Sequence, residues 1–308
     1  MTRRLFTSLA LALLTAGLTG CLDWVQQTAT YQHDPKTDTV RIFQTYHGLF
    51  GSDEPAEITR NEIEQLDSVL KGQRTFFFAN WIAEFSRAKI EEALTNSLAA
   101  APDGTGAELA RQTAQKQNLE ALLKLLLANV RVENGVFYLD TEKRLGGVQR
   151  VTLSRFSQLV PAANRVLRDL IIEEAAKLDG ADERKARLNR WLERKEDVLT
   201  VTGNRLLIRG PVTRAEYEKA IADDAKYQKV LAEFVAGGGE IRHENDAVIV
   251  RIGTETAPRV SVRLSVAEKP YRTNLVHYLQ GRQPIRPTFA PEAAAAEFLS
   301  APPGTPGR

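Results

Sequence analysis

Helix-forming segments and β-hairpin sequences alternate along this chain, and this alternation restricts the folds open to it. The helical segments begin near Ala107, Ala162 and Thr213, and each is followed by β-branched and aromatic residues with a turn signal among them. Tight turns join antiparallel strands, whereas parallel strands need long crossovers. We therefore predict an α+β fold in which antiparallel β-hairpins alternate with amphipathic helices.

Residue patterns place the individual strands and turns. Asn134-Gly135 is typical of a type I′ turn and predicts that residues 130–140 form a complete hairpin. Two further hairpins are predicted over 198–209 and 240–252, with turns at Gly203-Asn204 and Glu244-Asn245-Asp246. Additional strands are predicted at 24–31, 39–46, 148–153 and 259–266.

Capping signals and apolar spacing place the helices. Thr59 with Glu62, and Thr213 with Glu216, match the capping box, in which each side chain bonds the backbone amide of the other residue. Ser86 is a further candidate N-cap. We predict a helix after each of these three caps, the last one reaching residue 236. Further helices are predicted at 107–129, 162–178, 182–195 and 274–279.

The amino-terminal segment has the layout of an export signal. Arg3 and Arg4 precede an apolar run over residues 5–16, and small residues follow it. This run is too short to cross a bilayer, which takes about 20 apolar residues. Residues 1–20 are therefore predicted to be a signal peptide that is removed from the mature protein.

The end of this segment, Leu18-Thr19-Gly20-Cys21, resembles the lipobox of bacterial lipoproteins. The resemblance implies attachment of a diacylglycerol to Cys21, cleavage before it, and usually acylation of the new amino terminus. The membrane is then a partner of the protein through the lipid on Cys21. The alternative is an ordinary signal peptide in which a cysteine stands by chance.

The cysteine count agrees with lipidation. Cys21 is the only cysteine, so the chain cannot form an internal disulfide. In lipoproteins of double-membraned bacteria, Asp after the cysteine resembles an inner-membrane retention signal. Leu22 stands here instead, which favours the outer membrane if the organism has one. Strand-like sequence begins at Trp24, so we expect the folded body close to the lipid.

Composition and charge are those of a globular protein without a nucleic-acid partner. The chain has 308 residues, of which 43% are hydrophobic and 26% charged. Its formal net charge is +2. Removing residues 1–20, which hold two arginines and no acidic residue, leaves the charges balanced. Neutralising many phosphates needs a basic surplus, which is missing.

No catalytic or metal-binding motif stands out. The histidines, His33, His47, His243 and His277, lack ligand spacing. Gly237-Gly238-Gly239 lacks the ending of a phosphate loop, and no GxSxG element occurs. Glu173 and Glu183 have Lys177 and Arg187 four positions later, which predicts surface ion pairs. We therefore assign no catalytic residue, metal or cofactor, and a non-enzymatic role is favoured.

An aromatic cluster is the one feature with a ligand interpretation. It consists of Phe76, Phe77, Phe78, Trp81 and Phe85. Large apolar residues usually lie inside a protein, so core packing in a buried strand is one interpretation. The other is the wall of an apolar groove for an acyl chain or a protein partner.

The carboxyl-terminal segment differs in composition from the rest. Residues 282–308 are rich in proline and alanine, with few large apolar residues, which predicts a disordered tail. The α+β body would then span residues 21–281.

These observations favour a lipid-anchored lipoprotein of the cell envelope with a non-enzymatic interaction or structural role. A carrier for an apolar ligand such as a lipid is the second hypothesis. A hydrolase whose site is assembled from distant residues is the third.

Overall fold

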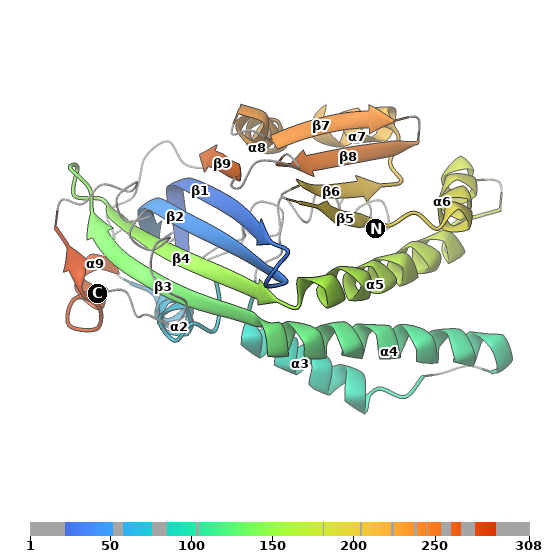
Figure 1. Ribbon diagram of the computed structural model, residues 1–308, viewed down its shortest axis with the longest axis horizontal. Coiled ribbons are helices and arrows are strands. Elements are labelled where there is room, and N and C mark those ends of the chain that lie inside the picture. Colours follow the sequence, from blue (N-terminus) through green and yellow to red (C-terminus); the bar gives the residue numbers. More distant parts are fainter. Residues whose placement is uncertain are drawn as a thin grey trace.

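A computed structural model of the chain confirms the α+β fold (Figure 1). It describes residues 22–51, 58–75, 85–102, 105–180, 182–203, 205–222, 225–236, 239–244, 246–253, 260–265 and 275–287. The signal peptide and Cys21 lie outside these ranges. Within them, no helix combines the length and the apolar composition needed to cross a membrane.

The larger of two sheets has six strands in the order β10-β3-β4-β2-β1-β9. The strands are β1 (Leu22–Asp34), β2 (Thr39–Gly51), β3 (Val130–Leu139), β4 (Leu145–Ser154), β9 (Val260–Ser265) and β10 (Ile285–Arg286). Every neighbouring pair is antiparallel except β10 with β3. The strands predicted at 24–31, 39–46, 148–153 and 259–266 are therefore confirmed, and each of the first three extends further than expected.

The predicted turn at Asn134-Gly135 is wrong. β3 continues through these residues without a turn. Its pairing with β4 shifts register between Asn134 and Phe137, as in a β-bulge. The Asn134 side chain explains the difference, because it donates a hydrogen bond to the carbonyl of Val69 at 2.7 Å and accepts one from Gln149 at 2.9 Å. The hairpin turns instead at residues 140–144.

One face of this sheet carries the core. Val40 and Ile42 of β2 lie opposite Leu153 and Val151 of β4, and alternation places all four on the same face. Helix α2 (Arg60–Leu70) contributes Leu66 and Val69 to the same buried cluster. Its predicted capping box is present, with Thr59 accepting from the Glu62 amide and Glu62 accepting from the Thr59 amide.

The smaller sheet has the strand order β5-β6-β8-β7. Its strands are β5 (Leu199–Thr202), β6 (Arg205–Gly210), β7 (Gly239–Glu244) and β8 (Ala247–Ile252), which confirms the hairpins predicted at 198–209 and 240–252. Helices α6 (Glu183–Arg194), α7 (Arg214–Ala222) and α8 (Ala225–Ala236) accompany it. The last two cover the segment predicted as one helix, on either side of residues 223–224, which are outside the described ranges.

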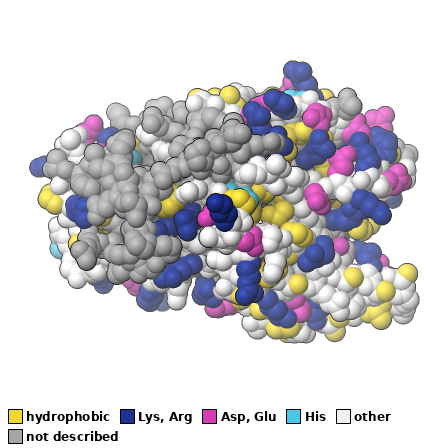
Figure 2. Space-filling view, viewed as in Figure 1, with side chains coloured by type: hydrophobic (Ala, Val, Ile, Leu, Met, Phe, Trp, Pro, Cys, Tyr) yellow, Lys and Arg dark blue, Asp and Glu magenta, His cyan; other side chains and the backbone are white. Residues whose placement is uncertain are grey.

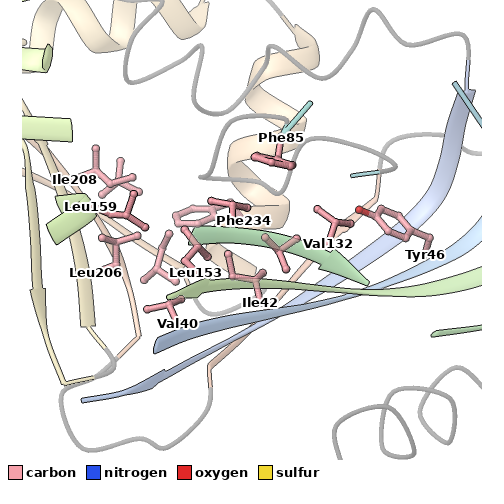
Figure 3. Close-up of a cluster of buried hydrophobic side chains, with 14 of the residues drawn as sticks. Val40, Ile42, Tyr46, Phe85, Val132, Leu153, Leu159, Leu206, Ile208 and Phe234 are labelled. Atoms are coloured by element: carbon pink, nitrogen blue, oxygen red, sulfur yellow. The ribbon is translucent and has the colours of Figure 1, made fainter. Parts of the chain in front are cut away.

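The two sheets share one continuous apolar core. Figure 3 shows Leu206 and Ile208 of β6 beside Leu159, and Phe234 of α8 beside the large-sheet residue Leu153. Polar contacts join the same parts. Asn164 donates to the Leu199 carbonyl and accepts from the Leu199 amide, both at 2.8 Å, so one side chain pairs with the β5 backbone as a strand would.

Helix α5 (Phe156–Ala176) starts six residues before the predicted start at Ala162. Its N-cap residue, Arg155, makes no side-chain cap bond. The cap comes from Asp38 in the β1–β2 turn, whose carboxylate accepts from the Ser157 amide at 2.8 Å and from the Ser157 hydroxyl at 2.7 Å. Pro161 lies inside the first turns, where it removes one backbone hydrogen bond.

One of the two predicted ion pairs is wrong. Glu173 and Lys177 are paired at 2.8 Å as expected. Arg187, however, is buried and binds both carboxylate oxygens of Glu216, not Glu183. The i,i+4 spacing is met in α6, but the Arg187 side chain points to the Pro211 carbonyl and to Glu216 of α7.

The expected disordered tail does not begin at residue 282. Helix α9 (Leu275–Leu279) buries Leu275 and Leu279, and β10 then pairs Ile285 with Phe137 of β3. Arg282 stacks on Tyr278, with its guanidinium carbon 3.7 Å from the ring centroid, and Tyr278 donates to Asp67 of α2. Residues 288–308 lie outside the described ranges, so disorder remains a prediction for them.

A pair of truncations tests this boundary. A chain ending at Gly281 loses the β10 pairing and the packing of Ile285, and we expect its free energy of unfolding to fall by about 2 kcal/mol. A chain ending at Pro287 keeps both, and we expect it to have the same melting temperature as the full-length protein. Thermal unfolding followed by circular dichroism measures both. Equal melting temperatures for the two truncations would show that β10 contributes nothing.

Candidate functional site

The predicted aromatic groove is only partly described. Phe76, Phe77, Phe78 and Trp81 lie outside the described residues, so for them the groove stays a prediction. Phe85 is buried, 7% exposed, and belongs to the main core cluster (Figure 3). Its carbonyl accepts a hydrogen bond from the Thr75 amide. Phe85 therefore supports core packing for its own part of the cluster.

The structure does not bring the four histidines together. His33 bonds the Gly203 carbonyl, His243 packs edge-on against Tyr217 with ring centroids 4.9 Å apart, and His277 is exposed on α9. Burial raises the pKa of Tyr217 to about 12, so this phenol stays protonated at neutral pH. Across the described residues, no group of three or more His, Cys, Asp or Glu side chains could hold a metal ion.

The fourth histidine, His47, belongs to a polar cluster at the β3–β4 turn. Its Nε2 lies 3.1 Å from an Asp140 oxygen and 2.8 Å from an Arg144 nitrogen. Asp140 also accepts from the Glu142 amide and from the Arg144 amide and guanidinium. Burial alone would raise the pKa of Asp140, but the Arg144 bonds outweigh it and keep the pKa below its ordinary value. The carboxylate therefore stays ionised and closes the turn.

A second region is built differently, because two of its three helices bury very little. Helices α3 (Arg87–Ala99) and α4 (Gly106–Asn129) pack against each other and, with α5, form an arm that extends beyond the large sheet (Figure 1). α3 has no buried residue, and α4 buries only Leu123. Helices in globular proteins depend mainly on tertiary packing for their stability. Much of the surface of α3 and α4 is exposed.

Apolar side chains are exposed on this arm. Among the described residues, the exposed large hydrophobic side chains are Leu98, Leu109, Leu119, Leu170 and Val235, and the four leucines all belong to α3, α4 or α5. Figure 2 shows hydrophobic side chains at the surface of the arm, at the lower right. Clustered exposed apolar residues mark interaction sites more often than single ones do.

A groove lies between the three helices of the arm, with a volume of about 320 Å³. Leu119 of α4 and Val166 and Leu170 of α5 supply its large apolar side chains. Small residues at the end of α3 and polar residues of α4 and α5 complete the lining: Ser97, Ala100, Ala101, Pro102, Gln112, Gln115, Lys116, Asp169 and Glu173.

The polar residues of the groove are held by neighbouring groups. Lys116 donates to the Ala100 carbonyl at 2.6 Å, at the end of α3, where a cation is favourable. Asp169 accepts from Asn118 at 2.8 Å, and Glu173 is paired with Lys177. These contacts fix the rim, and the groove leucines Leu119 and Leu170 are 38% and 39% exposed. The groove is suited to an apolar segment with polar flanks.

Sequence reasoning missed this site because it used the apolar spacing of this segment only to predict a helix at 107–129 and asked nothing of its exposed faces. Leu119 is 38% exposed, whereas Leu123 is buried. A signal was present in the sequence: leucines occupy positions 109, 119, 122, 123, 125, 126 and 127, which cover more than one helix face. A helix with one core-facing stripe does not need apolar residues on its other faces.

Comparison with known proteins adds nothing to this site, since no family model, curated protein or solved structure matches the chain.

Proposed function

We propose that this protein is a lipid-anchored lipoprotein of the cell envelope, placed by preference at the outer membrane, that binds a protein partner through the groove of its helical arm. The anchor is supported by the Leu18–Cys21 motif, the export-like segment before it and the absence of any other cysteine from the sequence. The role is that of an interaction module without catalysis.

The observation that carries the interaction role is the exposure of leucines on the helices of the arm, two of which bury almost nothing. Leu98, Leu119 and Leu170 are 55%, 38% and 39% exposed, in an arm whose α3 buries no residue. Exposed apolar surface in water is unfavourable by roughly 25 cal/mol per Å², so covering it favours binding. Large apolar side chains are exposed mainly on this arm, whereas those of the two sheets are buried in the core. This difference supports the arm as the surface that binds a partner.

The shape of the groove indicates what kind of segment binds there. Gln112, Lys116 and Leu119 line one wall at helical spacing, and Val166, Leu170 and Glu173 line the other. Such ridges fit the side chains of another helix, as in the helix-in-groove mode of recognition. The partner segment would be an amphipathic helix with an apolar stripe between polar flanks.

Charged substitutions in the groove test the interaction. We expect the double variant Leu119→Glu, Leu170→Glu to bind its partner about 100-fold more weakly, because two carboxylates would lie in the apolar centre of the interface. Cross-linking in intact cells from a photoreactive residue at Gln112 measures the loss. The melting temperature should stay unchanged, since both leucines are already exposed.

Ala114→Glu is the matched control, since it adds a carboxylate to an exposed position of α4 outside the groove. It should leave the cross-linked product intact. A product that survives in the double variant would rule out the groove as the binding surface.

A carrier function for an apolar ligand is the second candidate, and the groove volume favours it. About 320 Å³ lies at the lower end of the range for small-molecule sites. Native mass spectrometry of the delipidated protein separates the two functions. A bound lipid that disappears in the double variant would favour the carrier.

A further inference from the structure

We infer that the end of the large sheet carrying the β3–β4 turn rests on the membrane, with Thr141–Lys143 against the lipid headgroups and the groove of the arm held away from them. This inference rests on the proposed lipidation of Cys21 and adds an orientation to it. The surface involved is the turn itself, and the partner is an anionic phospholipid surface.

The first step is the length of the tether. Cys21 is bonded to Leu22, so their Cα atoms are about 3.8 Å apart. Leu22 is already the first residue of β1, pairs with Gly51 of β2 and is 3% exposed. No free segment separates the lipid from the sheet. The end of the sheet at Leu22 must therefore lie at the headgroups.

The second step is the register of the neighbouring strands. His47 of β2 pairs with Gly146 of β4, while Gly51, four residues further along β2, pairs with Leu22. Because β2 and β4 are antiparallel, the position level with Gly51 lies four residues before Gly146. That position is Glu142, at the tip of the β3–β4 turn. Two strand spacings separate this turn from β1, which is roughly 10 Å. The turn therefore lies at the same end as the anchor and close to it.

The third step is the chemistry of the turn. Lys143 is exposed and adopts a left-handed backbone conformation with φ of 59°. Asp140 and Glu142 both form ion pairs with Arg144. Lys143 forms no ion pair with any residue in the described ranges. A lysine near an anionic bilayer is attracted to it, and its long apolar stem lets the ammonium reach the headgroups.

The fourth step is the position of the arm. α4 joins β3 at Val130, the opposite end of β3 from the turn, and α5 follows the matching end of β4 (Figure 1). β3 has ten residues and spans roughly 33 Å. The groove residues Gln112–Leu119 lie about 15–26 Å further along α4. Added along one direction, these lengths hold the groove roughly 50–60 Å from the bilayer, where another envelope protein can reach it.

Site-specific fluorescence quenching tests this orientation. With Cys21 lipidated, a second cysteine is the only free thiol of the protein. The full-length Thr141→Cys and Ala114→Cys variants, purified from membranes and labelled, are placed in phosphatidylethanolamine–phosphatidylglycerol vesicles carrying a nitroxide headgroup quencher. We expect the label at position 141 to lose most of its emission and the label at 114, on the arm, to keep it.

Two further measurements complete the test. Lys143→Glu in the Thr141→Cys background should reduce quenching on these anionic vesicles, and unchanged quenching would overturn the headgroup contact of Lys143. An unquenched label at 141, or equal quenching at 114, would overturn the orientation. The intact mass of each sample is measured as well. A lipidated chain with the wrong quenching refutes the orientation alone, whereas a chain without lipid refutes the anchor and the orientation together.

Discussion

Loss of the Cys21 thiol is expected to release the protein from the membrane. The variant carries serine at position 21 and, in place of residues 1–20, a signal peptide that is cleaved without lipidation. Burial contributes about 0.8 kcal/mol per methylene, so a second chain of about 14 buried methylenes adds roughly 11 kcal/mol. We therefore expect the variant in the soluble fraction and the natural protein almost entirely in the membrane fraction.

Fractionation with immunoblotting measures this distribution, and the intact mass of the natural mature protein identifies the lipid. The matched control is Thr19→Ser, which keeps a small residue inside the proposed recognition motif and should leave both lipidation and location unchanged. A natural protein with an unmodified Cys21, or a serine variant that stays on the membrane, would contradict the anchor.

The second large effect concerns the link between α6 and α7. Arg187 is 7% exposed and donates to the two Glu216 oxygens at 2.5 and 2.7 Å and to the Pro211 carbonyl at 3.2 Å. Glu216→Gln removes the negative charge and leaves the buried guanidinium without its counter-ion. Breaking a fully buried ion pair is strongly destabilising. Because the Glu216 side chain is 40% exposed, we expect a smaller loss, about 2 kcal/mol in unfolding free energy.

The choice of glutamine isolates the ion pair. Glu216 is also the third residue of α7, where it forms the capping box with Thr213, and glutamine can fill that position. Glu218→Gln is the control, because the Arg214–Glu218 pair on the same helix is exposed and should leave the melting temperature unchanged. Adding Arg187→Met to Glu216→Gln should cost less than the two single changes together, and strict additivity would show that the pair does not couple.

The same pair has a defined pH dependence. Burial alone would raise the pKa of Glu216, but the Thr213 amide and the Arg187 guanidinium outweigh burial and hold the pKa below the ordinary value of 4.5. A carboxylate with a lowered pKa in the folded state contributes stability above the unfolded pKa and loses it as the pH falls. The difference between the natural protein and Glu216→Gln should therefore be full at pH 7 and shrink below about pH 4.5. A constant difference would mean that charge is not its cause.

Local sequence determined those parts of the fold that depend on residues a few positions apart. The Thr59–Glu62 and Thr213–Glu216 capping boxes and the Glu173–Lys177 pair are all present. Each needs only backbone geometry within one helical turn, so spacing alone predicts it. The α+β class and most strands followed in the same way, from alternation and turn residues.

Tertiary structure decided what depends on partners distant in the chain. Asp38 caps α5 from a turn 119 positions earlier, Asn134 bonds α2 and stays within a strand, and Arg187 turns to Glu216. Local alternatives existed for each, and long-range hydrogen bonds outweighed them. The candidate site depends on the same difference. Apolar spacing marks Leu119 and Leu123 equally, and only the packing of α3, α4 and α5 decides that Leu123 is buried while Leu119 lines an open groove.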